Sequence, residues 1–242
     1  MGLTRFVINS LLSIGLVGAT GNLGAAAIVT LNAVDSGWYK SNGLHNDTIE
    51  NYIAGWSKST GDMHRNWFVF DLTDVTDVIT DARLRLELPS HGYTGDAESQ
   101  TFVLSHVETP VASLRSFHYE KDAGGQAIYQ DLGDGSTYAT VSVTPADQGT
   151  TLEIALNADA IFHLNQESSL FAFGGKLADI HFGHTLFPGT YSGNVRQLVL
   201  TVDPVPEPST MTVFALGGLC LMLPAYRRKR RSSVAQATRA SQ

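Results

Sequence analysis

The middle of the chain alternates apolar and polar residues with a period of two, which is the pattern of β-strands with one buried face. In residues 83–88, three leucines share one side while two arginines and a glutamate share the other. The same alternation recurs in residues 140–144, 151–156 and 197–202. Gly, Pro, Asn and Asp gather between these runs, as expected for turns. The pattern predicts short antiparallel strands.

Further runs rich in β-branched and aromatic residues extend this prediction. They are residues 28–32, 67–72, 101–106, 170–173 and 180–183. About nine short strands predict an all-β fold, a single antiparallel β-sandwich or jelly roll over residues 28–203. Helix is scarce in this region. We expect only two short helices, one capped by Thr109 and running through Ser116, and one capped by Asn157 or Asp159 and running through Leu164.

The N-terminus carries the pattern of a secretory signal peptide. Arg5 supplies a positive charge, residues 6–17 are largely apolar, and small residues follow up to Ala27. An uncleaved anchor is the alternative, but the apolar run is short for a membrane span. We therefore predict a signal peptide over residues 1–27, which makes Ile28 the first mature residue.

The C-terminus has three successive parts. Residues 204–209 read PVPEPS, and prolines hold such a linker extended because they cannot donate to a β-ladder. Residues 210–226 carry no charge, and at about 1.5 Å per residue they are just long enough to cross a thin bilayer. A basic cluster, which is retained on the cytoplasmic side, follows at once: Arg227, Arg228, Lys229, Arg230 and Arg231. We predict a transmembrane sorting helix over residues 210–226, with the β domain outside and a short polar tail over residues 232–242.

This arrangement resembles the PEP-CTERM sorting tail of Gram-negative bacteria. Pro206, Glu207 and Pro208 stand at the signature positions, and the resemblance covers residues 204–231. It implies that an exosortase-like membrane enzyme processes the protein at this motif. It also implies export, transit through the inner membrane, and delivery to the outer envelope or the extracellular space, with signal peptidase and the exosortase as partners. An ordinary single-pass anchor with a proline linker is the alternative.

The middle carries a second resemblance. The stretch from NYIAGW at residues 51–56 through residues 65–88 is similar to the opening of jelly-roll domains in extracellular bacterial proteins. The stretch from Tyr129 (YQDLGDGSTYATVSV) through Asn157 (LNADAI) to the Gly174-Gly175 pair resembles the second half of uncharacterised PEP-CTERM proteins. The resemblance implies a jelly-roll-like fold and export, but it implies no ligand.

Charge and cysteine usage narrow the function classes. All 23 acidic residues lie between Asp35 and Glu207, and seven of the 16 basic residues lie outside this stretch. The nine remaining basic residues leave a net charge of −14, which disfavours nucleic acid as a partner. Cys220, the sole cysteine, lies in the apolar tail, so the middle forms neither a disulfide nor a thiolate metal site.

Two groups of residues suggest binding chemistry. Trp38, Tyr39 and Trp56 are expected in loops, where exposed rings would stack on sugars of an exopolysaccharide. Asp131 and Asp134 lie in the sequence DLGDGS, where two carboxylates beside glycines would wrap a calcium ion. A turn with glycine at positive φ is the alternative for this segment. No other cofactor is expected.

The remaining polar residues fit structural roles. His181 and His184, if they lie on a strand, point to opposite faces and do not chelate together. His91, His106 and His118 are scattered along the sequence. Arg65 and Asp71 flank one predicted strand, so we expect an ion pair that ties this strand to its neighbour.

The sequence contains none of the common catalytic motifs that we sought, namely GxSxG, a P-loop and HExxH. We therefore expect a structural or adhesive, non-enzymatic protein of the extracellular matrix or biofilm. The first alternative is a carbohydrate-binding module. The second is a hydrolase, which would require two carboxylates about 5–10 Å apart in a cleft.

Overall fold

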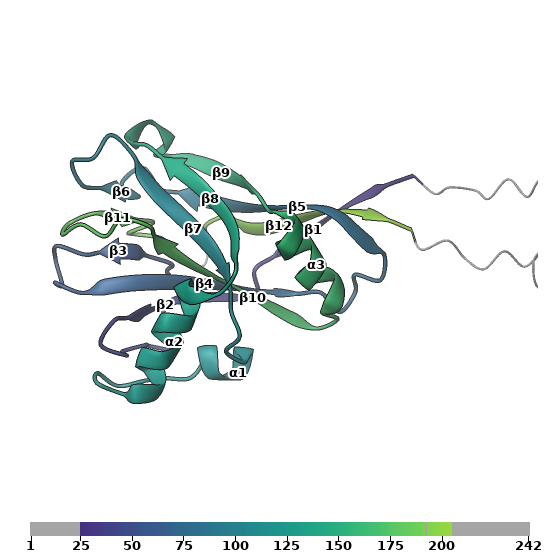
Figure 1. Cartoon of the computed structure of the whole chain (residues 1–242). Helices are drawn as coiled ribbons and strands as arrows, with labels where there is room; N and C mark the ends of the chain where they lie inside the picture. Colours follow the sequence, from purple (N-terminus) through teal and green to yellow (C-terminus); the bar gives the residue numbers. More distant parts are fainter. Residues whose placement is uncertain (1–24, 192, 205–242) are drawn as a thin grey trace, which may run out of the picture. The chain divides into compact units, whose positions relative to one another are not determined.

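The computed structural model describes residues 25–191 and 193–204, and in this part the strands form two antiparallel sheets (Figure 1). The four-stranded sheet contains, in order, β1 (Ala27–Asn32), β12 (Arg196–Asp203), β5 (Val78–Leu88) and β9 (Thr150–Ala155). The eight-stranded sheet contains, in order, β6 (Tyr93–Thr94), β11 (Thr185–Leu186), β3 (Ala54–Trp56), β4 (Met63–Asp71), β10 (Leu170–Leu177), β7 (Gln100–His106) and β8 (Thr137–Val143), and β2 (Asp35–Lys40) pairs with β4. The prediction of a mostly β fold with antiparallel sheets is confirmed.

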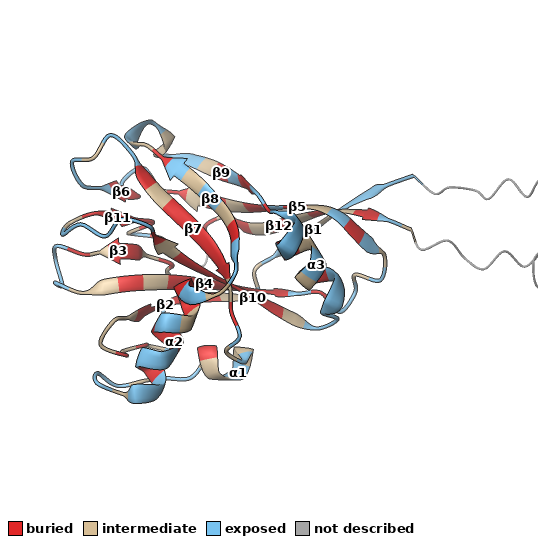
Figure 2. Cartoon of the chain, in the orientation of Figure 1, coloured by how far each residue is buried: buried red, intermediate tan, exposed pale blue. Residues whose placement is uncertain are grey.

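One hydrophobic core joins the two sheets. Leu84 and Leu86 of β5 and Phe68, Phe70 and Phe173 of the larger sheet are all fully buried in it. Figure 2 shows buried positions along the strands of both sheets. Each such side chain contributes roughly 1.5–3 kcal/mol relative to an exposed one. This packing is consistent with the predicted sandwich.

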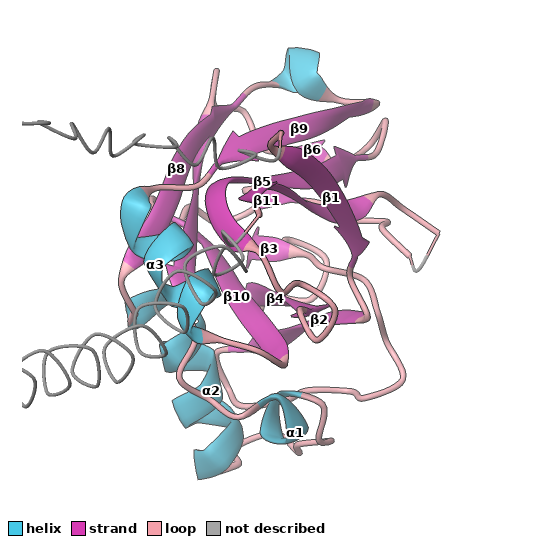
Figure 3. Cartoon of the chain, turned by 90° about the vertical axis from the view of Figure 1, so that its right-hand side faces the viewer, coloured by secondary structure: helices cyan, strands magenta, loops and turns pink. Residues whose placement is uncertain are grey.

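A second, smaller core covers the outer face of the larger sheet. Here α2 (Ala123–Asp134) packs Leu132 against Trp67 and Val69 of β4, whose neighbours Phe68 and Phe70 face the main core. Figure 3 shows α2 running along the outside of this sheet. At Gly174 of β10 a Cβ would lie 2.4 Å from the carbonyl oxygen of Leu132. Glycine at this position therefore allows the helix backbone to touch the sheet.

The other helices are short. Asn157 caps α3 (Ala158–Gln166) by accepting a hydrogen bond of 3.0 Å from the Ala160 amide, as predicted, and the helix ends two residues beyond Leu164. The first predicted helix is shorter than expected, because α1 spans Val111–Leu114 with Pro110 at its cap position. A short 3-10 helix, η1, spans Pro145–Asp147.

Several element predictions were wrong. Residues 180–183, predicted as a strand, form a loop with a single bridge between Phe182 and Trp56, because Gly183 turns the chain at φ +88°. The sequence analysis missed β2, β3, β6 and β11. It also missed α2, whose sequence AGGQAIYQDLGD contains three glycines and so disfavours a helix locally. Burial of Ile128, Tyr129 and Leu132 against the sheet offsets that cost.

The predictions for the two ends of the chain lie mostly outside the described residues. Residues 1–24 of the predicted signal peptide are outside them, and so is the sorting tail from residue 205, with the predicted transmembrane segment 210–226. The predicted cleavage point follows Ala27, which is the first residue of β1 and pairs with Val202. Among the helices of residues 25–191 and 193–204, none is long and apolar enough to cross a membrane.

Candidate functional site

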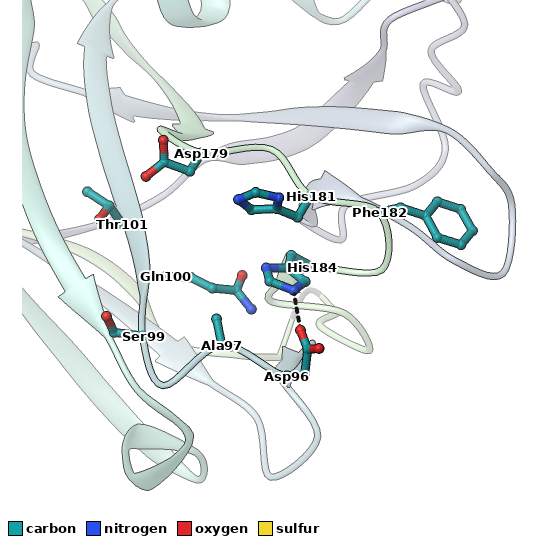
Figure 4. A pocket seen from close by; sticks show the side chains of 9 residues that line it. All are labelled: Asp96, Ala97, Ser99, Gln100, Thr101, Asp179, His181, Phe182 and His184. Carbon is teal, nitrogen blue, oxygen red and sulfur yellow. Dashed lines mark hydrogen bonds and ion pairs between the residues drawn. The ribbon is translucent and has the colours of Figure 1, made fainter.

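A pocket of about 620 Å³ opens at one end of the larger sheet (Figure 4). Its walls come from the segment between β6 and β7, from the start of β7, and from the loop between β10 and β11. Ligand pockets for small molecules typically measure about 300–1,000 Å³. The pocket therefore has room for a ligand of that size.

Backbone hydrogen bonds hold the loop between β10 and β11 against β3. The Trp56 amide donates to the carbonyl oxygen of His184 at 2.8 Å, and the Gly183 amide donates to that of Trp56 at 2.9 Å. The hydroxyls of Thr94 and Thr185 lie 2.6 Å apart and connect β6 to β11. The loop is thus fixed from two neighbouring strands.

His184 and Asp96 form the charged edge of the pocket. The Nε2 atom of His184 lies 2.9 Å from Oδ1 of Asp96, and His184 is buried whereas Asp96 is exposed. This hydrogen bond lowers the pKa of the Asp96 carboxyl, which therefore carries a negative charge at neutral pH. Gly95, at φ +119°, lets the His184 ring approach, because a Cβ there would lie 2.6 Å from Cδ2 of His184.

Gln100 presents an unsatisfied acceptor at the pocket. Its Nε2 donates to the carbonyl oxygen of Thr94, and its side chain points toward His184 in Figure 4. Gln100 is only 5% exposed, yet its Oε1 has no hydrogen-bond partner among the described residues. A buried acceptor without a donor costs roughly 1–3 kcal/mol. Because Oε1 is itself buried, a ligand in the pocket would reach it only if the Gln100 side chain turned.

A second hollow, also of about 620 Å³, shares Asp96, Phe182 and His184 with the first. Phe182 is 55% exposed, and Figure 4 shows its ring turned away from the other labelled side chains. The ring centroid lies 5.3 Å from that of Trp56, with the planes 86° apart. Trp56 and Phe182 thus form an edge-to-face aromatic pair beside the polar pocket.

The structure separates the three aromatic residues proposed to bind sugars. Trp38 and Tyr39 lie in β2 rather than in a loop, and both are buried. The Tyr39 ring stacks on His45 at 4.4 Å, and its hydroxyl donates to the carbonyl oxygen of Leu114 at 3.1 Å. The loop prediction for these two residues was wrong, because β2 is covered by packing on both faces. Trp56 alone of the three remains partly exposed.

Asp131 and Asp134 lie in α2, so the predicted loop at DLGDGS was wrong. Asp131 accepts hydrogen bonds from the amide and hydroxyl of Thr109, at 2.7 and 2.6 Å. Asp134 pairs with Arg65 at 3.2 Å. The helix thus uses both carboxylates to attach neighbouring segments to itself.

Arg65 and Asp71 do not tie β4 to a neighbouring strand as predicted. Arg65 reaches α2 instead, and Asp71 accepts bonds from the amide and hydroxyl of Thr73 at 2.9 and 2.6 Å. These bonds lower the pKa of the Asp71 carboxyl. Asp71 therefore stabilises the turn after β4.

The structure brings His181 and His184 together, with ring centroids 5.2 Å apart, because their segment is a loop. The expectation that they point to opposite faces of a strand was wrong. His106 stacks on His163 at 4.7 Å, and His118 bonds to Asp122, both away from the pocket. Within residues 25–191 and 193–204, no group of three or more His, Cys, Asp or Glu residues is arranged to hold a metal ion.

The sequence analysis missed Asp96, Gln100 and Phe182. Asp96 and Gln100 lie in a stretch without periodicity, and the structure places Asp96 beside a histidine 88 residues away. Gly183 and the nearby Pro188-Gly189 pair are turn signals that indicate a loop around Phe182. A loop predicted from these turn signals would have identified Phe182 as a candidate binding residue.

Comparison with protein-family models finds the PEP-CTERM protein-sorting motif at residues 204–231. This range contains the predicted signature Pro206, Glu207 and Pro208 and the basic cluster from Arg227 to Arg231. The resemblance inferred from the sequence is confirmed. No curated protein matches the chain.

Proposed function

Because the chain is an exported protein that an exosortase sorts to the cell envelope or the extracellular space, we propose that its β domain acts there as a structural or adhesive, non-enzymatic protein. The sorting motif carries this proposal. It begins at Pro204, directly after β12, and β12 is paired on both sides, with β1 and with β5. Sorting of the tail therefore delivers the entire domain.

The proposal includes the finer steps of the route. Signal peptidase removes residues 1–27, and the segment 210–226 holds the precursor in the inner membrane. The exosortase then acts near Pro206–Pro208 and passes the domain to the outer envelope or to an exopolysaccharide matrix. The net charge of −14 between Asp35 and Glu207 supports an extracellular partner other than anionic lipid.

The arrangement of the domain supports an adhesive role. Ala27 pairs with Val202, so the chain enters and leaves the described domain at the same end. Figure 1 shows β3, β6 and β11, which border the pocket, at the opposite end. A domain attached at its C-terminal end, after β12, would present the pocket end to its surroundings.

The contacts of His184 support the non-enzymatic part of this proposal. Its Nε2 is engaged by the Asp96 carboxylate rather than by a hydroxyl. An activated serine or threonine nucleophile requires a base within hydrogen-bond reach of its hydroxyl. The pocket therefore offers binding groups rather than an assembled nucleophile.

The second candidate function is a carbohydrate-binding module that docks to exopolysaccharide. The observation that favours it is the edge-to-face pair of the partly exposed Trp56 and the exposed Phe182 beside a polar pocket. Trp38 and Tyr39, which were expected to share this role, are buried and do not support it.

The test of sorting compares the wild-type protein with Glu207→Ala in the native host. Cell fractions are separated, and the intact mass of the protein is measured in each. The expected wild-type protein is found outside the inner membrane and lacks the residues beyond about residue 208. Glu207→Ala should stay full-length in the inner membrane. Val205→Ala, which leaves Pro-Glu-Pro intact, is the matched control and should behave as wild type.

Retention of full-length wild-type protein in the inner membrane would overturn the proposal. The tail would then be an anchor, and the domain would act at the membrane surface. The structural or adhesive role would be contradicted if the processed wild-type protein were found only in the medium and not on cells or matrix.

A further inference from the structure

We propose that the pocket formed by Asp96, Gln100, Asp179 and His181, together with the exposed ring of Phe182, binds a glycan built of neutral or amino sugars. This inference rests on the carbohydrate-binding candidate function and does not depend on the sorting step. It names the site and the charge class of the ligand.

The pocket wall is rich in hydrogen-bond acceptors. The carboxylate residues Asp96 and Asp179 line it together with the Gln100 side chain (Figure 4). Asp179 is exposed and has no hydrogen-bond or ion-pair partner among the described residues. Such a wall requires a ligand with several donors. The free hydroxyl groups of a sugar unit supply several such donors.

Phe182 adds the apolar contact that a sugar ring needs. Phe182 is 55% exposed. Its ring packs edge-to-face against the ring of Trp56, and this contact fixes its orientation. The indole nitrogen of Trp56 donates to the carbonyl oxygen of Gly61 at 3.1 Å, which holds the tryptophan in place. An aromatic face that is held rigidly binds a flat apolar surface at little cost in side-chain entropy.

The size of the site fits more than one sugar unit. The two hollows of about 620 Å³ each meet at Asp96, Phe182 and His184. A chain of linked sugars would lie across both, with Phe182 between neighbouring units. A polymer is therefore a better occupant than a single free sugar.

Charge sets the class of glycan. Asp96 is held ionised by its hydrogen bond with His184, and Asp179 adds a second carboxylate to the same wall. Carboxylate or sulfate groups on a ligand would be repelled at this distance, whereas ammonium groups would be attracted. The first hollow thus selects against uronic acids and sulfated sugars in the units that it holds, whereas the second hollow is also lined by the cation Lys58.

The test uses the full-length chain in detergent and isothermal titration with three probes. These are a cello-oligosaccharide, a chitosan oligosaccharide and an oligogalacturonate. We expect the neutral or the amino probe to bind at least about tenfold more tightly than the acidic probe. Because sorting plays no part in this measurement, failure here leaves the sorting proposal intact.

Two variants, each with a matched control, connect the binding to the pocket. Phe182→Ala should weaken binding about tenfold, whereas Phe162→Ala, which removes a similarly exposed ring from α3, should leave it unchanged. Asp179→Lys should reduce the preference against oligogalacturonate, whereas Asp74→Lys in the turn after β4 should not. Since all four positions are exposed, unfolding temperatures should match that of wild type.

Three results would overturn the proposal. They are the absence of binding to all three probes at millimolar concentration, equal or tighter binding of oligogalacturonate, and equal effects of Phe182→Ala and Phe162→Ala. The last result would place glycan binding elsewhere on the domain.

Discussion

Arg65 of β4 reaches across to α2 and pairs with the carboxylate of Asp134, 3.2 Å away. The same guanidinium group donates to the carbonyl oxygens of Tyr129 and Gln130, at 3.0 and 2.7 Å, and lies 4.6 Å from the Tyr129 ring centroid. No basic residue of α2 lies in its own last turn, so Arg65 supplies the cation that stabilises this end of the helix.

Removal of this cation should loosen α2. We expect Arg65→Ala to lower the free energy of unfolding by about 2–3 kcal/mol, because three hydrogen bonds to a largely buried charged group are lost. Arg83→Ala on β5, where the side chain is 55% exposed, should change it by less than about 0.5 kcal/mol. Urea unfolding followed by tryptophan fluorescence measures both. Equal effects of the two variants would contradict the role assigned to Arg65.

Gly174, at the contact between α2 and β10, and Gly124, in the first turn of α2, should respond to alanine in opposite directions. Gly174→Ala places a Cβ 2.4 Å from a backbone oxygen of α2, so we expect a loss of about 1–3 kcal/mol as the helix moves away. At Gly124, in the first turn of α2, the nearest atom to a Cβ lies 3.5 Å away. Gly124→Ala should therefore raise stability by up to about 1 kcal/mol. A stabilised Gly174→Ala variant would show that the helix does not touch β10 closely.

Acidification from pH 7 to 4.5 should destabilise the domain through His64. Burial lowers the pKa of His64 to about 4 in the folded chain. Its unfolded pKa is about 6.5, so below that pH the unfolded chain takes up a proton that the folded chain does not. The contribution of neutral His64 to the free energy of unfolding is fully present above pH 6.5 and is lost as the pH falls toward 4. The loss at pH 4.5 is about 2.5 kcal/mol.

The variant His64→Leu isolates this contribution. The difference between its unfolding free energies at pH 7 and pH 4.5 should be smaller than that of wild type by roughly the same 2.5 kcal/mol. His91→Leu, at an exposed loop position, should keep the wild-type difference. An unchanged pH dependence in His64→Leu would assign the acid sensitivity to other groups.

Neutralising the basic cluster should disturb retention of the tail. With Arg227, Arg228, Lys229, Arg230 and Arg231 replaced by serine, the positive charge that keeps the end of the chain in the cytoplasm is lost. We expect more full-length, unprocessed protein outside the inner membrane, as measured by intact mass of each fraction. Arg239→Ser, beyond the sorting motif, should leave processing unchanged.

Much of the main core could be predicted from the sequence. The leucines of β5 and the runs in β9 and β12 alternate strictly, and each run became a strand with its apolar side buried. One-sided burial leaves this mark on the sequence because successive side chains of a strand point to opposite faces. β2 left no such mark, since four consecutive residues from Ser36 to Tyr39 are all buried.

The candidate pocket could not be predicted in this way. Asp96 and His184 are 88 residues apart, and neither belongs to a periodic run. Their contact depends on the close approach at Gly95 and on the pairing of β11 with β3 and β6. The histidine pair itself was noticed from the sequence, but its geometry was misjudged because the segment was read as a strand.

The sequence by itself determined that this protein carries a PEP-CTERM sorting motif and that its domain is mostly β. A sorting motif is recognised within one continuous stretch of sequence. The alternation of apolar and polar residues in a strand reflects only which adjacent positions along the chain are buried. Both signals are therefore local in the sequence. The tertiary structure decided that Trp38 and Tyr39 are buried, that Asp131 and Asp134 lie on a helix, and that Asp96, Gln100 and Phe182 border one pocket. These outcomes depend on which distant segments pack together, and the packing energy of two sheets and a helix determines that choice.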